Sequence, residues 1–158
     1  MSVHVKKASE KEISVIVILL REFAEFENLS EFCEVTEEKL KDAMFGENAF
    51  VEGLITFDGE TPIGYTLFYP NFASFRGQKG LYLEDIYIKQ DCRGKGVGEM
   101  MLRHLARIAK ERGCERIDFQ VPDWNTPAIK FYEKLGAKRD EEERHFKFTD
   151  EAFKNLAS

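Results

Sequence analysis

The chain has 158 residues, of which 43% are hydrophobic and 33% are charged, a composition that supports one packed domain and excludes a disordered tail. Its net charge of −6 disfavours nucleic acid as a partner, because a phosphate backbone is bound by clustered lysine and arginine. The longest apolar run, Val15 to Leu20, has six residues, whereas a membrane span needs about 20, so we expect a single domain over residues 1–158 and no membrane contact.

The N-terminal part of the chain predicts a short strand followed by two helices. The strand is expected at His4 to Lys6. Ser9 to Glu12 has the spacing of a capping box, and apolar residues follow it at helical period, which predicts a helix from Glu10 to about Phe26. Thr36 is placed as a second N-cap, and the short helix after it is expected to end by Gly46.

The apolar period then changes from helical to alternating. This change predicts strands at residues 50–57 and 63–69, joined by a hairpin turn at Asp58-Gly59. The segment LYLEDIYIK at residues 81–89 is a third expected strand. The elements expected after it are a helix at 97–112 capped by Gly113, a strand at 117–121, a helix at 126–135 and a last strand at 144–148.

These elements predict an α+β domain with a mixed, mostly antiparallel central sheet flanked by helices. The expected order is one strand, two helices, three strands, a helix, a strand, a helix and two final strands. The most defined part is the strand-turn-helix unit at residues 81–112, because its alternating and helical periods are both strong.

Residues 22–60 carry twelve acidic residues against two lysines, a local charge of −10 within a chain of −6. Such an excess can concentrate cationic small molecules near a cleft, although a solvated helix face explains most of these residues equally well.

Three cysteines, Cys33, Cys92 and Cys114, stand without a C-x-x-C pair, which argues against a disulfide framework and a zinc cage. The three histidines show no metal-ligand spacing either, so we expect no metal. The sequence MSVHVKK at the N-terminus lacks the apolar region of a signal peptide. A reducing, cytoplasmic setting is therefore expected.

A glycine-rich turn, Arg93 to Gly98, lies between a predicted strand and a predicted helix. Free N–H groups at such a helix start favour an anion such as a diphosphate. A dinucleotide fingerprint would need glycine at position 99, which is Glu99, and the Gly-Lys-Ser/Thr ending of a P-loop is also missing. The turn therefore predicts either a different phosphate site or only a tight connection.

Several separated motifs carry a resemblance to a known family. Arg93, Gly96 and Gly98 fit the pattern R/Q-x-x-G-x-G/A, and this turn follows LYLEDIYI and precedes Trp124-Asn125 and the segment FYEKLGA at residues 131–137. The chain resembles the GNAT superfamily of N-acetyltransferases over nearly its whole length. Within it, the segments EFAEFE at 22–27, YLEDIY at 82–87, DWN at 123–125 and FKF at 146–148 resemble the diamine acetyltransferases, the spermidine/spermine and thialysine enzymes.

The resemblance implies a single N-acetyltransferase domain that uses acetyl-CoA as co-substrate. Backbone amides at the start of the helix would hold the cofactor's diphosphate, and the preceding strand would extend its pantetheine arm through main-chain hydrogen bonds. The residues implied in cofactor binding are Ile86, Tyr87, Ile88, Arg93, Gly94, Lys95, Gly96, Val97, Gly98, Glu99, Asn125 and Ala128.

The reaction implied by the resemblance is direct acetyl transfer to an amine that arrives protonated. With an ordinary pKa near 10.4, making the amine neutral at pH 7 costs roughly 4.6 kcal/mol. Glu84 is the expected base, directly or through a water, and Asp85 its acidic neighbour in the acceptor site. On a regular strand the two side chains point to opposite faces unless a bulge intervenes.

Tyr132 corresponds to the family's general acid, which donates to the leaving thiolate. A tyrosine with a pKa near 10 is a weaker acid than a thiol near 8.5, so full transfer is uphill by about 2 kcal/mol and donation to developing charge is favoured. The alternative role of Tyr132 is packing of its helix on the sheet.

A small polycation has a second charge, which must be held away from the reacting nitrogen. Five residues match the family's acceptor site: Phe26 and Glu27 at the end of the first helix, and Asp118, Phe119 and Gln120 on the later strand. Glu143 stands where polyamine enzymes carry tryptophan, which favours thialysine, lysine-like or short diamine acceptors as much as spermidine.

Two other functions stay open on the same fold. One is a protein acetyltransferase that acts on lysine or an N-terminal amine, and the other is a non-catalytic acyl-CoA-binding protein. Glu84 and Tyr132 together weigh against the second, and the acidic segment favours a compact polycation over a peptide. The resemblance also implies a homodimer.

Overall fold

The computed structural model describes residues 2–158 and forms two compact units, one ending at Gln120 and one beginning at Val121. A single domain over the whole chain stays a prediction. Within residues 2–158, no helix combines the length and the apolar character that a membrane crossing requires.

The first unit is built on a five-stranded sheet in which the strands are ordered as they occur in the chain. The first four strands are antiparallel and the last pair is parallel, which confirms a mixed, mostly antiparallel sheet. The strands are β1 (Val3–Lys7), β2 (Glu52–Asp58), β3 (Thr61–Ala73), β4 (Gln78–Ile88) and β5 (Arg116–Asp118).

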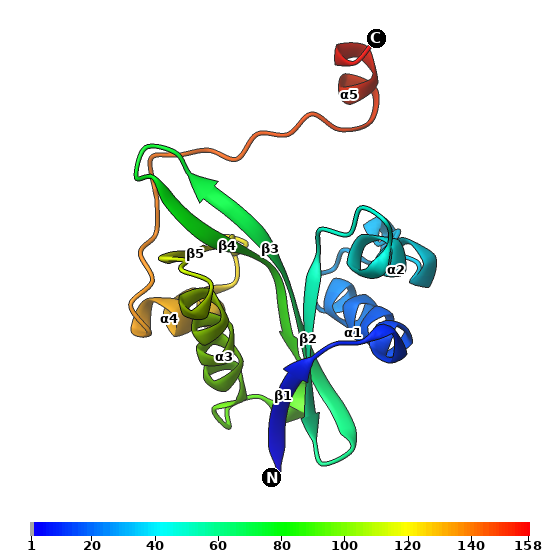
Figure 1. The fold of residues 1–158 in the computed structure, drawn as a ribbon, viewed down its shortest axis with the longest axis vertical. Helices are drawn as coiled ribbons and strands as arrows, with labels where there is room; N and C mark the ends of the chain where they lie inside the picture. The colour runs from blue at the N-terminus through cyan, green and yellow to red at the C-terminus, as the bar shows by residue number, and fades with distance from the viewer. Residues whose placement is uncertain (1) are drawn as a thin grey trace. The chain divides into compact units, whose positions relative to one another are not determined.

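Helices cover both faces of this sheet (Figure 1). On one face lie α1 (Ile13–Phe26) and α2 (Glu37–Phe45), and on the other lies α3 (Val97–Glu111). Short 3₁₀ turns at Glu10–Glu12, Ser30–Phe32 and Gln90–Cys92 connect them. We call these the α1 face and the α3 face of the sheet.

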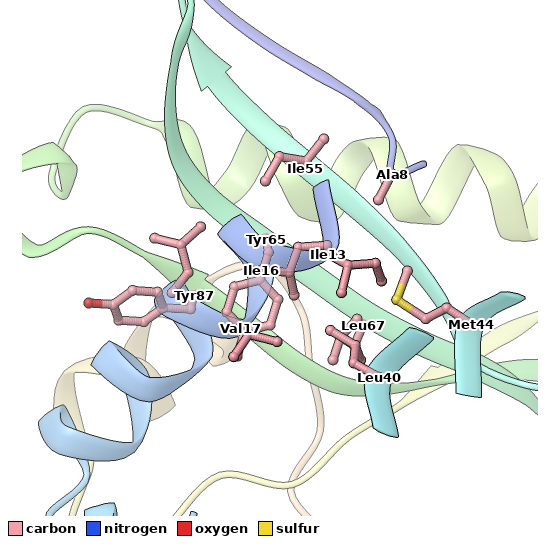
Figure 2. Close-up of a cluster of buried hydrophobic side chains, with 11 residues drawn as sticks. Ala8, Ile13, Ile16, Val17, Leu40, Met44, Ile55, Tyr65, Leu67 and Tyr87 are labelled. Atoms are coloured by element: carbon pink, nitrogen blue, oxygen red, sulfur yellow. The ribbon is translucent and has the colours of Figure 1, made fainter. Parts of the chain in front are cut away.

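The predicted capping box starts the α1 region. The Ser9 side chain accepts from the Lys11 amide, while the Glu12 carboxylate accepts from the Ser9 amide at 2.8 Å. The helix then buries Ile16 and Val17 against Tyr65 of β3 and other sheet residues (Figure 2). Each fully buried aliphatic side chain of this kind contributes about 1.5–3 kcal/mol, so this contact fixes the α1 face.

The α3 face has its own core, which anchors the start of α3. Val97 and Met101 pack with Ile63 of β3, and Leu105 packs with Phe68 of β3 and other buried residues. Because Val97 is the first residue of α3 and is almost fully buried, the turn before it is held close to the end of β4.

The second unit contains α4 (Thr126–Lys134) and α5 (Asp150–Leu156). Asn125 caps α4 through its side-chain oxygen, which accepts from the Ala128 amide at 3.3 Å. Gly136 follows α4 with φ of 102°, a conformation that glycine adopts without strain and that ends the helix as predicted.

The prediction of two strands after α4 is wrong. In the described chain no strand follows β5, and residues 144–148 are exposed and without regular structure. The alternation of Phe146 and Phe148 suggested a strand, but a strand needs a neighbour to satisfy its N–H and C=O groups. The helix α5, with Asp150 and Glu151 in its first turn and Lys154 in its last, was not predicted.

Candidate active site

A bulge in β4 places Glu84 and Asp85 on the same face of the sheet. Leu67 of β3 pairs with Asp85 while the next residue, Phe68, pairs with Leu83, so Glu84 is the extra residue. Asp85 is paired with Leu67, which belongs to the α1-face core, and the Glu84 carboxylate reaches Tyr69 of the same face. The structure therefore brings together the two carboxylates that a regular strand would separate.

Asp85 is the more enclosed of the two carboxylates. The hydroxyl of Tyr65, a fully buried residue, donates to its Oδ2 at 2.9 Å. Burial raises the pKa of the Asp85 carboxyl to about 6, although the hydrogen bond from Tyr65 acts in the opposite direction and the charges of Glu84 and Glu27 add to the rise. Asp85 therefore changes its charge closer to neutral pH than an ordinary aspartate does.

Glu84 is exposed, and it accepts from the Tyr69 hydroxyl at 3.3 Å. Across the described residues, neither Glu84 nor Asp85 forms an ion pair with a lysine or arginine. By contrast, Glu22 on the same face is paired with Lys89 at 3.2 Å. The bulge thus carries uncompensated negative charge.

The end of α1 contributes the next two predicted residues. Phe26 is the last residue of α1, and the Arg93 guanidinium lies 4.5 Å from the centre of its ring. Burial raises the pKa of the neighbouring Glu27 carboxyl, whose charge acts on Asp85. Glu27 therefore belongs to the same group of acids as Asp85.

The predicted acceptor residues of the later strand are separated by the structure. The Asp118 carboxylate is bound by the Arg116 guanidinium at 2.9 Å and by the Asn71 amide at 3.0 Å. Phe119 follows β5, which ends at Asp118 rather than at the predicted residue 121, and its side chain packs with the core of the α3 face. Gln120 is exposed at the end of the first unit.

The glycine turn has the geometry of an anion site. Gly94 and Gly96 have φ of 76° and 80°, and a Cβ placed on either would meet no atom within 4 Å. Among the described residues, the N–H groups of Gly94, Lys95, Gly96, Val97, Gly98 and Glu99 donate to no other group outside the regular helix. Open donors at the N-terminus of a fifteen-residue helix fit a diphosphate.

Arg93 fixes this turn to β4. Its Nε donates to the Ile88 carbonyl at 2.9 Å, and its guanidinium lies 5.5 Å from the Tyr87 ring as well as over Phe26. The guanidinium therefore connects the turn, the end of β4 and the end of α1, and it occupies one carbonyl of the predicted pantetheine strand.

The edge of β4 beyond Tyr82 is open towards the β5 side. In the part of the chain that the structure describes, β5 pairs only with Gly80 to Tyr82. The segment that contains Ile86 and Tyr87 therefore has a strand neighbour on the β3 side alone among these residues. An open strand edge can hydrogen-bond an extended ligand.

The second unit holds the remaining predicted residues. The oxygen of the Asn125 side chain is used in capping α4, where Ala128 is the donor. Burial raises the pKa of Tyr132 to about 12, and the ring packs edge-on against Phe131 with 5.2 Å between centres. The Tyr132 hydroxyl therefore stays protonated at any physiological pH.

Two tyrosines were missed by the sequence reasoning. Tyr65 and Tyr69 donate to the two carboxylates, and they lie on one face of β3 opposite LYLED. Their even spacing in a predicted strand was the available signal, but it identifies a site only when the register with β4 is known. Within residues 2–158, no cluster of three potential metal ligands is found.

Comparison with known proteins agrees with this geometry. Residues 18–137 match the acetyltransferase (GNAT) family. The chain is 35% identical to a thialysine N-epsilon-acetyltransferase of Sus scrofa, over 99% of this chain and 98% of that protein. It is also 40% identical to an L-ornithine N5-acetyltransferase of Arabidopsis thaliana, over 59% of this chain and 41% of that protein.

Solved structures agree at the level of the fold. An integron cassette protein from the mobile metagenome of V. cholerae superposes with a TM-score of 0.80 at 24% identity, covering 99% of this chain and 98% of that one. Together with the motif order and the glycine turn before α3, these likenesses decide the classification: the chain belongs to the GNAT family of acetyltransferases.

Proposed function

We propose that the protein is an acetyl-CoA-dependent N-acetyltransferase that moves an acetyl group directly to a primary amine of a small polycation, a basic amino acid or a diamine. The observation that carries this proposal is the pair Glu84 and Asp85, which share one face of the sheet and, within residues 2–158, form no ion pair with a lysine or arginine. Relatives that act on thialysine and on ornithine support the same class of acceptor.

The glycine turn is proposed to bind the cofactor's diphosphate. The open N–H groups from Gly94 to Glu99 would donate to its oxygens, and Lys95 would add positive charge. The free edge of β4 at Ile86 and Tyr87 would orient the pantetheine arm by main-chain hydrogen bonds, with Asn125 and Ala128 as further contacts. Acetyl-CoA supplies an activated acetyl thioester when bound.

The carboxylate pair would bind the ammonium of the acceptor and take its proton. Removing that proton at pH 7 costs roughly 4.6 kcal/mol for an ordinary amine, so a base close to the nitrogen is needed. Glu84 is the proposed base, directly or through a water, and the raised pKa of Asp85 makes it a second proton acceptor beside Glu84.

Tyr132 is proposed as the hydrogen-bond donor to the leaving sulfur. Because burial raises its pKa to about 12, its hydroxyl is a weak acid that stabilises developing charge by a hydrogen bond rather than by full proton release. Loss of this hydrogen bond should therefore slow turnover without weakening acceptor binding.

The part of the acceptor that carries its second charge is assigned to Phe26, Glu27 and Asp118, and to Phe119 and Gln120, which follow Asp118 in the chain. Glu27 and Asp118 would attract ammonium groups, and the Phe26 ring would cover an apolar stem.

Two further expectations belong to this proposal. We propose a homodimer, on the family resemblance alone, and a reducing cytoplasmic setting, which the three unpaired cysteines support. A sedimentation measurement tests the first and fractionation of cells tests the second.

Turnover with a defined set of amines tests the function. The purified protein is incubated with acetyl-CoA and with ornithine, lysine, thialysine, putrescine, spermidine or a lysine peptide, while release of free thiol is measured. Thiol release with small amines and little with the peptide supports the proposal. Release with the peptide alone, or tight binding of acetyl-CoA without turnover of any amine, overturns it.

A further inference from the structure

Two polar side chains flank Gly80 on the α1 face, and both bind a third, Asp118. Gly80 of β4 pairs with Asn71 of β3 on one side and with Arg116 of β5 on the other. A Cβ on Gly80 would lie 2.6 Å from Arg116 Cγ and 2.7 Å from Asn71 Oδ1. The glycine thus leaves the space in which these two side chains approach each other across the strand.

Both neighbours hold the same carboxylate. The Arg116 Nε donates to both oxygens of Asp118 at 3.1 and 3.2 Å, its Nη2 donates at 2.9 Å, and the Asn71 amide donates at 3.0 Å. Asp118 is therefore fixed in place by two residues from different strands.

The group can still bind one anionic and one cationic group of a ligand. Through the described part of the chain, Arg116 Nη1 donates to no group, and the side chains of Arg116 and Asp118 are each about one third exposed. Within residues 2–158, the Oδ1 of Asn71 is buried and has no hydrogen-bond partner, so Asn71 serves to hold Asp118. A guanidinium with an unused Nη1 beside a partly exposed carboxylate matches a zwitterion.

The group also has a defined position relative to the carboxylates of the bulge. Asp118 pairs with Tyr82, which is three residues before Asp85 on β4, a separation of about 10 Å along a strand. Between them the rings of Tyr69 and Tyr82 stack with 5.3 Å between centres. The charges of both Glu84 and Asp118 act on the Tyr82 hydroxyl, so an aromatic surface joins the two charged ends.

We propose that Arg116 and Asp118, the latter positioned by Asn71, recognise the α-amino-acid head of the acceptor, while its side-chain amine lies at Glu84 and Asp85. Arg116 takes the α-carboxylate, Asp118 takes the α-ammonium, and the methylene stem lies over Tyr69 and Tyr82. The substrate class is therefore a basic α-amino acid rather than a plain diamine. This inference rests on the proposed function and deepens it.

Matched pairs of acceptors test the inference. Ornithine and putrescine, and lysine and cadaverine, differ only by the α-carboxylate. With the wild-type protein we expect a higher kcat/KM for the amino acid of each pair. In Arg116→Gln we expect that value to fall roughly ten- to a hundredfold for the amino acids and to stay nearly constant for the diamines.

Arg116→Lys should restore part of the preference, because it retains the charge without the planar fork. Arg107→Gln, a change on the exposed side of α3, is the matched control and should leave all values unchanged. Asp118→Asn should weaken turnover of lysine while sparing 6-aminohexanoate, which lacks the α-amine. Unchanged thermal stability and acetyl-CoA affinity show that each variant is folded.

The outcomes separate the two proposals. Acetylation of diamines as efficiently as of amino acids, or an equal loss for both in Arg116→Gln, overturns the α-amino-acid inference and leaves the acetyltransferase proposal standing. No turnover of any amine by the wild-type protein overturns the proposed function, and the inference with it.

Discussion

The carboxylate bulge at Glu84 and Asp85 and the glycine turn at 93–98 lie near one end of β4, yet they would attract ligands of opposite charge. Among residues 2–158, the bulge holds negative charge without a paired lysine or arginine, and the N–H donors of the turn have no protein acceptor. By contrast, Arg112 and Glu52 of the same unit neutralise each other through two 2.6 Å hydrogen bonds. Because Glu84 and the turn at Gly94 to Gly96 are exposed, we expect the two regions to bind ligands of opposite charge.

The largest expected effect tests the bulge. Asp85→Asn keeps the shape and the hydrogen bond from Tyr65 but removes the negative charge, so we expect kcat/KM for the amine to fall by roughly 10²–10⁴. Acetyl-CoA affinity should not change, because the turn is untouched. Initial rates and isothermal titration with acetyl-CoA measure the two quantities, with Glu84→Gln as the parallel variant.

The pH dependence of kcat/KM and of Tm, compared between wild type and Asp85→Asn, tests the direction of the pKa shift of Asp85. In the wild-type protein the pKa of Asp85 is about 6, so kcat/KM should decrease as the pH falls through 6 and Asp85 gains its proton. The raised pKa means that proton binding favours the folded state, a contribution present below about pH 4 and lost as the pH rises through 6. Asp85→Asn should therefore increase Tm relative to wild type above pH 6, and a decrease there would contradict the buried position of this charge.

The sequence predicted the turn better than the bulge, for a physical reason. Gly94 and Gly96 act through local backbone conformation, which residue identity determines directly. The bulge depends on how β3 and β4 are aligned, so the sequence left open whether Glu84 and Asp85 share a face. Helix boundaries were predictable for the same local reason, as the Ser9 capping box shows.

The error at residues 144–148 teaches the same distinction. In this segment Phe146 and Phe148 alternate with polar residues, which is the period of a strand. Whether such a segment becomes a strand depends on a neighbouring strand elsewhere in the chain. The tyrosines that donate to the carboxylates could not be assigned for this reason either. Local signals thus predicted elements, and long-range pairing determined the site.

Tyr132 should affect turnover and neither binding event. In Tyr132→Phe we expect kcat to fall by about 10², while the Kd of acetyl-CoA and the KM of the amine change little. Because the pKa of Tyr132 is about 12, the wild-type rate should show no loss from its ionisation up to pH 10. A variant with full activity would leave only a packing role for this ring.

The turn is tested by a glycine substitution with a matched control. Gly96→Ala forces a Cβ onto a backbone at φ of 80°, a strain of about 1–2 kcal/mol that should raise the Kd of acetyl-CoA roughly tenfold as the N–H groups rotate. Gly59→Ala introduces the same kind of strain at φ of 61° in the β2–β3 turn. It should reduce Tm similarly and leave the Kd unchanged, whereas equal effects on Kd would show that only global stability is at work.

The smallest expected effect concerns Glu27, which decides how far the negative region extends beyond β4. Burial raises the pKa of its carboxyl, and its charge acts on Asp85. Glu27→Gln should therefore raise the KM for dibasic acceptors about fivefold, the size of a partly screened ion pair of roughly 1 kcal/mol, and leave kcat nearly constant. Glu25→Gln, an exposed residue two positions earlier on α1, is the control, because residues two apart on a helix point to different sides. If both variants raise the KM equally, the attraction comes from the general charge of residues 22–60, and the specific site ends at Asp85.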